Sequence, residues 1–187
     1  MLSAAAAHAD GYANIGFDTG DLSGWTTFLR NGSAFVIADR DGYLPPMGGY
    51  FLAVGGGAGN SQQYVWQGAS LTKGEVLKGW VAFDRAATDV FFSDWAAAEV
   101  YNANLDTLVA GIWRSPDSPS TSWAKWTWTV PYNGYFYLAF SSSSQSSTYS
   151  QSFGLFDVRA TPNPEPGTFA LLLMGLPVAA LLRRRRT

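Results

Sequence analysis

The chain has 187 residues with a formal net charge of −2, no cysteine and a single histidine, His8. The lack of cysteine excludes disulfide bonds, thiolate nucleophiles and cysteine-built metal sites. Residues 10–161 carry 13 acidic and eight basic side chains, and this net charge of −5, with no basic patch, argues against nucleic acid as a partner.

The first nine residues end in the small-residue pattern of a signal-peptidase site, Ala7-x-Ala9. They lack the charged start and the full apolar stretch of a secretory signal, so we expect the signal to begin upstream of Met1; the alternative is a flexible tail. Cleavage by signal peptidase, after passage through the general export machinery, would leave Asp10 as the amino terminus. It would also remove His8, and with it any Ser-His-Asp triad or histidine-bound zinc.

The segment Asn14–Trp25 reads N-I-G-F-D-T-G-D-L-S-G-W. It resembles the opening of many exported β-sandwich domains of the galactose-binding or carbohydrate-binding type. The resemblance implies a structural calcium ion held by an early acidic residue and another near the end of the domain, here Asp18 and Asp157. The alternative is that Asp18 and Asp21 only make turns around Gly20, because calcium takes more oxygens than two carboxylates supply.

Residues 10–160 have the size of one domain and an all-β texture. Short stretches alternate apolar and polar side chains, are rich in Tyr, Phe, Trp, Val and Thr, and are separated by Gly, Asn, Asp and Ser. The chain from Asp94 reads as a loop entering a strand. The predicted strands are Ala34–Asp39, Tyr50–Val54, Gln63–Gln67, Val76–Asp84, Ala97–Tyr101, Thr107–Trp113, Trp126–Val130, Tyr135–Phe140 and Phe153–Arg159. They predict an antiparallel two-sheet β-sandwich of jelly-roll type.

Aromatic residues are numerous, with 8 Trp, 9 Tyr and 12 Phe. Trp126 and Trp128 share one face of a strand whose other face is polar, so we expect them to point into the core. Tyr135 and Tyr137 lie opposite the phenylalanine face of their strand and are the candidate surface rings for stacking on sugars. The stretch Ser141–Ser152 has almost no apolar content and predicts a mobile loop or a hairpin tip.

The sequence assigns no catalytic residue. A glycan-active hydrolase or lyase remains the alternative, because such an enzyme needs only two carboxylates about 5–10 Å apart. The natural pool is Asp84, Asp89, Asp94 and Glu99, which are close in sequence. They occupy what reads as one loop and a strand entry, where acidic residues are usually only solvated.

The end of the chain has three parts: Pro164-Glu165-Pro166 in the linker 161–167, an uncharged apolar run at 168–182, and the residues 183–187 with four arginines. The apolar run predicts a short transmembrane helix with its basic end in the cytoplasm. It is shorter than the ~20 residues of a usual span, so it suits a temporary anchor. The arginines are Arg183, Arg184, Arg185 and Arg186.

In this order the three parts resemble the PEP-CTERM sorting signal of exported bacterial proteins. The resemblance implies recognition in the inner membrane by an exosortase, cleavage near the Pro-Glu-Pro, and release or transfer to the cell surface. The alternatives are an ordinary membrane anchor, or a core helix with a basic end. A core helix would show a polar residue every third or fourth position, and this run shows none.

These features together predict an exported, non-catalytic protein of the cell surface or extracellular matrix. Its domain would be a binding or structural module associated with exopolysaccharide, with calcium as the only cofactor that the resemblances imply. Self-assembly through the aromatic-rich sheets is a third hypothesis.

Overall fold

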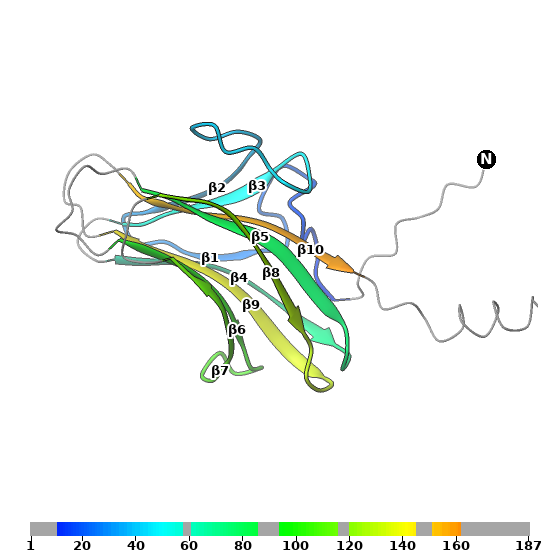
Figure 1. Ribbon diagram of the computed structural model, residues 1–187. Helices are drawn as coiled ribbons and strands as arrows, with labels where there is room; N and C mark the ends of the chain where they lie inside the picture. The colour runs from blue at the N-terminus through cyan, green and yellow to red at the C-terminus, as the bar shows by residue number, and fades with distance from the viewer. Residues whose placement is uncertain (1–10, 58–60, 86–93, 116–119, 145–150, 162–187) are drawn as a thin grey trace, which may run out of the picture.

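The structure is a computed structural model that describes residues 11–57, 61–85, 94–115, 120–144 and 151–161, with side chains up to Arg159. The regular structure in these ranges consists of strands (Figure 1). They are β1 (Thr26–Phe28), β2 (Ser33–Ile37), β3 (Phe51–Gly55), β4 (Ser61–Leu71), β5 (Val76–Asp84), β6 (Trp95–Tyr101), β7 (Leu108–Arg114), β8 (Thr121–Thr129), β9 (Gly134–Ser144) and β10 (Phe153–Thr161).

The strands form two five-stranded antiparallel sheets, stacked face to face (Figure 1). The first sheet has the order β1-β4-β9-β6-β7, and the second sheet has the order β2-β3-β10-β5-β8. From β3 onward the pairing is nested, with β3 on β10, β4 on β9, β5 on β8 and β6 on β7. This nesting is the wrapping of a jelly roll, so the antiparallel two-sheet sandwich expected from the sequence is confirmed.

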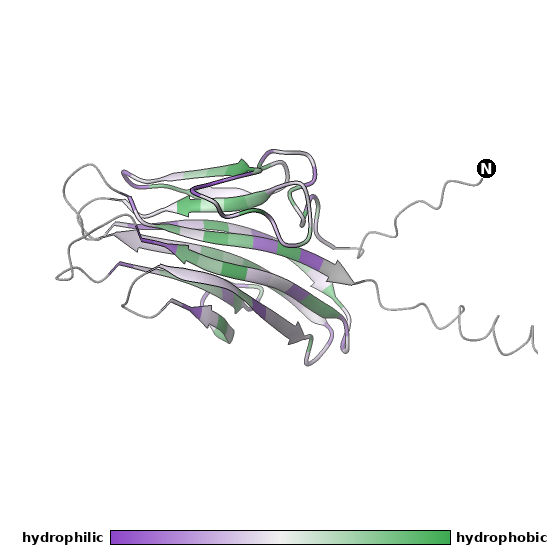
Figure 2. Cartoon of the chain, turned by 45° about the horizontal axis from the view of Figure 1, so that its top comes forward, coloured by the Kyte–Doolittle hydropathy of each residue, from purple (hydrophilic) through white to green (hydrophobic). Residues whose placement is uncertain are grey.

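The main core lies between the two sheets and is built by alternate positions of each strand. Figure 2 shows the alternation of apolar and polar positions along the strands. Phe140 of β9 stacks on Phe156 of β10, with ring centroids 4.5 Å apart, and so joins the sheets at their centre. Trp126 is 6% exposed and Trp128 packs against the same core, as the pattern of their strand predicted.

Two glutamines of β4 also point into the sandwich. Gln63 has no exposed surface, and its amide nitrogen donates to the carbonyl oxygens of Arg30 (2.6 Å) and Ser61 (2.9 Å). Gln67 is 6% exposed and donates to the carbonyl oxygen of Ala13 (2.9 Å). The amide of Gln63 is satisfied at both its nitrogen and its oxygen, whereas Gln67 Oε1 has no hydrogen-bond partner among the described residues. The hydrogen bonds of the two glutamines fasten the chain before β2 to the first sheet.

The serine-rich stretch differs from its prediction. Ser141–Ser144 are the end of β9 and are buried, whereas the sequence predicted a mobile loop or a hairpin tip from Ser141 onward. Their backbone is paired on both sides, with β4 and with β6. Serine is small enough to lie in a sheet interior once the backbone groups are satisfied, and composition alone does not reveal that pairing. Residues 145–150 lie outside the described residues.

A smaller apolar cluster covers the outer face of the second sheet. It consists of Phe51, Ala53, Ala82, Phe153 and Leu155. Tyr43, from the connection between β2 and β3 that stands above this sheet in Figure 1, and Trp123 of β8 pack over it. The Arg40 guanidinium lies 3.6 Å from the centroid of the Phe153 ring and 2.9 Å from Asp84. This part of the outer face of the second sheet is therefore covered by its own chain, whereas Lys125, Thr127 and Thr129 on β8 are exposed.

Within the part of the chain that the structure describes, no helix is long and apolar enough to cross a bilayer. The expected transmembrane segment at 168–182 lies outside that part. So do residues 1–9, Pro164-Glu165-Pro166 and the four arginines from Arg183 to Arg186.

Candidate functional site

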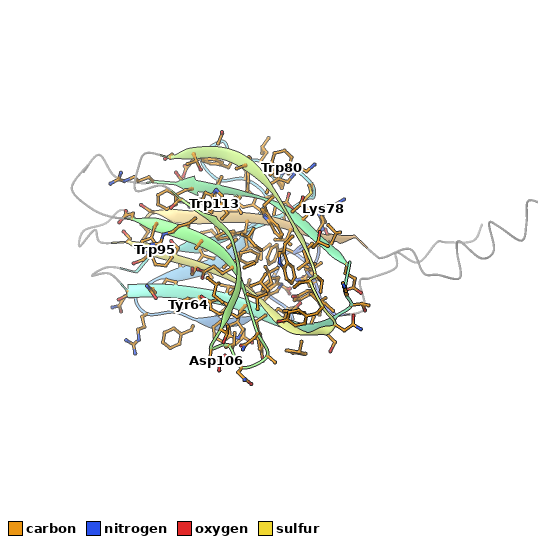
Figure 3. The ribbon with its side chains drawn as sticks, turned by 60° about the horizontal axis from the view of Figure 1, so that its bottom comes forward. Tyr64, Lys78, Trp80, Trp95, Asp106 and Trp113 are labelled. Carbon is orange, nitrogen blue, oxygen red and sulfur yellow. The ribbon has the colours of Figure 1, made fainter. Side chains whose placement is uncertain are left out.

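The outer face of the first sheet carries a groove bordered by aromatic rings. Phe28 on β1 stands opposite Tyr64 on β4, and the next outward position of β4 is Trp66. Figure 3 views the molecule from this side, with Tyr64 and Trp95 labelled. The groove has a volume of about 290 Å³. It is lined by Phe28, Tyr64, Trp66, Tyr101, Leu105 and Ala139.

The alternation of β4 explains why its two rings face outward. Gln63, Val65 and Gln67 point into the sandwich, and successive side chains of a strand point to opposite faces. Tyr64 and Trp66 must therefore stand on the outer face. The hydrogen bonds that keep Gln63 and Gln67 inside thus also fix the outward orientation of Tyr64 and Trp66, through the alternation of the strand.

The floor of the groove is made of small side chains. Ala139 on β9 lies between Trp66 on β4 and Glu99 on β6 in the cross-strand register. In the neighbouring row Ser141 lies between Tyr64 and Ala97. Large rings beside small floor residues leave a depression along the sheet, which a flat sheet of uniform side chains would not have.

Polar groups stand at one side of the groove. The Tyr101 hydroxyl donates to Glu99 Oε2 at 2.9 Å, and the Tyr64 hydroxyl contacts the Gln62 amide oxygen. Burial, followed by the hydrogen bond and the charge of Glu99, raises the pKa of Tyr101 to about 12. Burial and then the charge of Glu99 also raise the pKa of Tyr64. Both hydroxyls therefore keep their protons at neutral pH.

The two tyrosines proposed from the sequence lie beside this groove. Tyr135 and Tyr137 both point outward from β9 and meet edge to face, with ring centroids 5.3 Å apart. Tyr135 is 43% exposed, and Tyr137 stands opposite Tyr101 in the register. A role for this pair in stacking on sugars stays a prediction. The lining rings themselves were missed, although Tyr64 and Trp66 carry the signal of two aromatics at alternate positions of one strand.

Two carboxylates of the enzymatic alternative, Asp84 and Glu99, lie on opposite faces of the described sandwich and do not form a pair. Asp84 is on the outer face of the second sheet, bonded to Arg40, whereas Glu99 is on the outer face of the first sheet. Asp94 is 2% exposed and accepts a hydrogen bond from Ser152 Oγ at 2.5 Å. Asp89 lies outside the described residues. The sandwich core separates Asp84 from Glu99, so these two cannot act on one glycosidic bond.

Asp18 and Asp157, the two carboxylates of the calcium expectation, lie near enough for the charge of Asp18 to act on Asp157, but Asp18 is paired with the guanidinium of Arg159. Arg159 Nη1 donates to Asp18 Oδ2 at 2.7 Å, and Asp157 Oδ2 accepts from the Met47 N–H at 2.7 Å. Among the described residues no group of three or more acidic or histidine side chains converges on a point. The arrangement does not fit a calcium ion, because the guanidinium takes Asp18 Oδ2 and the carbonyl oxygens of Gly16 and Met47, and a positive group in this place repels a second cation.

No protein-family model matches the sequence, and no curated protein matches it. Solved structures do share its fold. TmCBM61, a carbohydrate-binding module in complex with β-1,4-galactotriose, is 14% identical with a TM-score of 0.50, over 82% of this chain and 99% of that chain. The K1 cleaved adhesin domain of Lys-gingipain from Porphyromonas gingivalis W83 is 15% identical with a TM-score of 0.50, over 79% and 96%.

The enzymatically active domain of tailspike protein 4 from bacteriophage CBA120 is 11% identical with a TM-score of 0.51. It is matched over 82% of this chain but only 22% of its own length. At these identities the likeness is one of fold. The chain thus has the β-sandwich fold found in carbohydrate-binding modules, in an adhesin domain and within a larger phage protein.

Proposed function

We propose that the sandwich domain binds a glycan chain in the groove of the first sheet and does not cleave it. The observation that carries the proposal is the groove itself, with Phe28, Tyr64 and Trp66 along its border and Ala139 in its floor. Ring faces pack on the apolar faces of sugar rings, and a few polar groups beside them fix the orientation of the ligand. An open groove along a sheet suits a chain better than a single small molecule.

The polar groups favour a neutral glycan. The protonated hydroxyls of Tyr64 and Tyr101 can donate to sugar oxygens, and Glu99 can accept from sugar hydroxyls. The same carboxylate would repel uronates or sulfated sugars. The TmCBM61 complex supports the proposal because that domain, which has this fold, holds β-1,4-galactotriose.

We also propose that the domain reaches the cell surface as a sorted protein. Signal peptidase would process its amino end, and an exosortase in the inner membrane would cleave near Pro164-Glu165-Pro166. The domain would then meet the exopolysaccharide of the envelope or matrix through its groove. The order of the three tail parts supports this route, which accounts for a binding domain joined to a weak apolar segment.

The test is retention of the full chain, purified in detergent, on immobilised galactan, xylan, β-glucan and a uronate polymer. Retention on a neutral polymer is expected, and Trp66→Ala should weaken it about tenfold, since one stacked ring contributes roughly 1–1.5 kcal/mol. Tyr50→Ala is the matched control, because Tyr50 is an exposed ring next to β3 of the other sheet.

Two results would count against the proposal. Equal retention of the Trp66 and Tyr50 variants would place binding outside the groove. Release of reducing ends that stops on changing Glu99 to glutamine would instead favour the hydrolase or lyase.

A further inference from the structure

We infer that the guanidinium of Arg159 holds the beginning and the end of this sandwich domain together, in the place where the sequence resemblance implied a calcium ion. Arg159, near the end of β10, has a structural role that is independent of glycan binding in the groove. The fold does not depend on calcium.

The hydrogen bonds of Arg159 join three segments that are far apart in sequence. Nη1 donates to Asp18 Oδ2 at 2.7 Å and to the Gly16 carbonyl oxygen at 3.3 Å. Nη2 donates to the Met47 carbonyl oxygen at 3.3 Å. A carboxylate and two backbone carbonyls are the kinds of oxygen that calcium takes, and here they face a fixed positive group instead.

Two glycines make room for the guanidinium. A Cβ atom at Gly16 would lie 1.6 Å from Arg159 Nη1, and one at Gly48 would lie 1.9 Å from Nη2. Neither position can therefore carry a side chain while Arg159 stays in place. A Cβ atom at the adjacent Gly49 would have no atom within 4 Å. The need for glycine is therefore specific to Gly16 and Gly48, which contact the guanidinium.

Asp157 contacts the same segment as Arg159, because its Oδ2 atom accepts a hydrogen bond from the Met47 N–H. Its side chain has no exposed surface, and its Oδ1 atom makes no hydrogen bond to any of the described residues. Burial raises its pKa, against the opposing effects of the Met47 N–H and the charge of Arg159. One guanidinium carries a single positive charge where calcium carries two, so it leaves the second carboxylate incompletely compensated.

The experiment follows the thermal unfolding of the full chain in detergent by tryptophan fluorescence, with ~5 mM calcium or with EDTA. This calcium concentration is roughly 5 to 50 times the dissociation constant of a weak extracellular site, so a bound ion would stabilise the folded chain measurably. The native chain should melt at the same temperature in both buffers. A melting temperature that rises by several degrees with calcium would overturn the inference.

Matched variants test the role of the arginine without calcium. Gly48→Ala should displace the guanidinium and lower the melting temperature by several degrees, whereas Gly49→Ala should leave it unchanged. Arg159→Ala should lower it at least as far as Gly48→Ala does. Equal melting of the two glycine variants, or an Arg159→Ala chain as stable as the native one, would show that the guanidinium does not hold these segments together. If Arg159→Ala fails to fold, the glycine pair and the calcium comparison still decide.

Discussion

Gln63 should be the polar residue on which the first sheet depends most. Its amide makes hydrogen bonds to both backbone groups of Arg30 and to the carbonyl of Ser61, with no exposed surface. Gln63→Ala would leave the Arg30 N–H and carbonyl without these partners in a partly buried place. Each such loss costs about 1–3 kcal/mol, so we expect a total of about 2–4 kcal/mol after some entry of water.

For a domain of this size, that loss lowers the melting temperature by roughly 5–15 °C. The assay is urea and thermal unfolding followed by tryptophan fluorescence. Gln62→Ala is the control, because Gln62 is the preceding residue of β4 and is exposed, so its change should stay within about 0.5 kcal/mol. The reasoning is refuted if the two variants lose the same stability. Because Arg30 follows β1, a folded Gln63→Ala chain should also bind glycan more weakly through Phe28.

The pH dependence of stability should contain a contribution from Asp157. Its pKa is raised on folding, so the folded state gains stability as pH falls through that pKa toward the unfolded value of about 3.9. When unfolding is measured from pH 7 to pH 4, the free energy of unfolding of Asp157→Asn, relative to that of the native chain, should therefore be higher at pH 7 than at pH 4. A difference between the two chains that stays constant with pH would contradict this. Separately, intact-mass measurement should find exported protein without the segment from about Thr168 onward. Alanines at Pro164-Glu165-Pro166 should retain the full precursor in the inner membrane, and full-length chain in every fraction would refute the sorting proposal.

The strands were predictable because burial on one face imposes alternation. Val76–Asp84 has the predicted bounds, and each of the other predicted strands overlaps an observed one. β1 was not predictable, since its three residues are all exposed and show no alternation. Its place follows only from pairing with β4, which is a tertiary contact.

The residues of the candidate site could be predicted from the sequence only in part, for a similar reason. Tyr135 and Tyr137 could be placed outside because Phe136 and Leu138 mark the inner face of β9. Tyr64 could not, because the residues that alternate with it include two glutamines, which look more solvent-facing than an aromatic ring. The glutamines are inside because backbone carbonyls 33 and 54 residues away accept their hydrogen bonds, and the Arg30 N–H donates a further one to Gln63. Nothing in the local pattern reveals those partners.

The position of β10 has a mechanical consequence. It is the last strand of the described chain, yet it lies in the middle of the second sheet, paired along its whole length with β5 and also with β3. Tension applied through residues beyond 161 would act along this strand and would have to shear both ladders at once. An edge strand such as β1 would instead peel away one hydrogen bond at a time. A domain held at its carboxyl end can therefore carry load from a moving polymer without unravelling from its point of attachment.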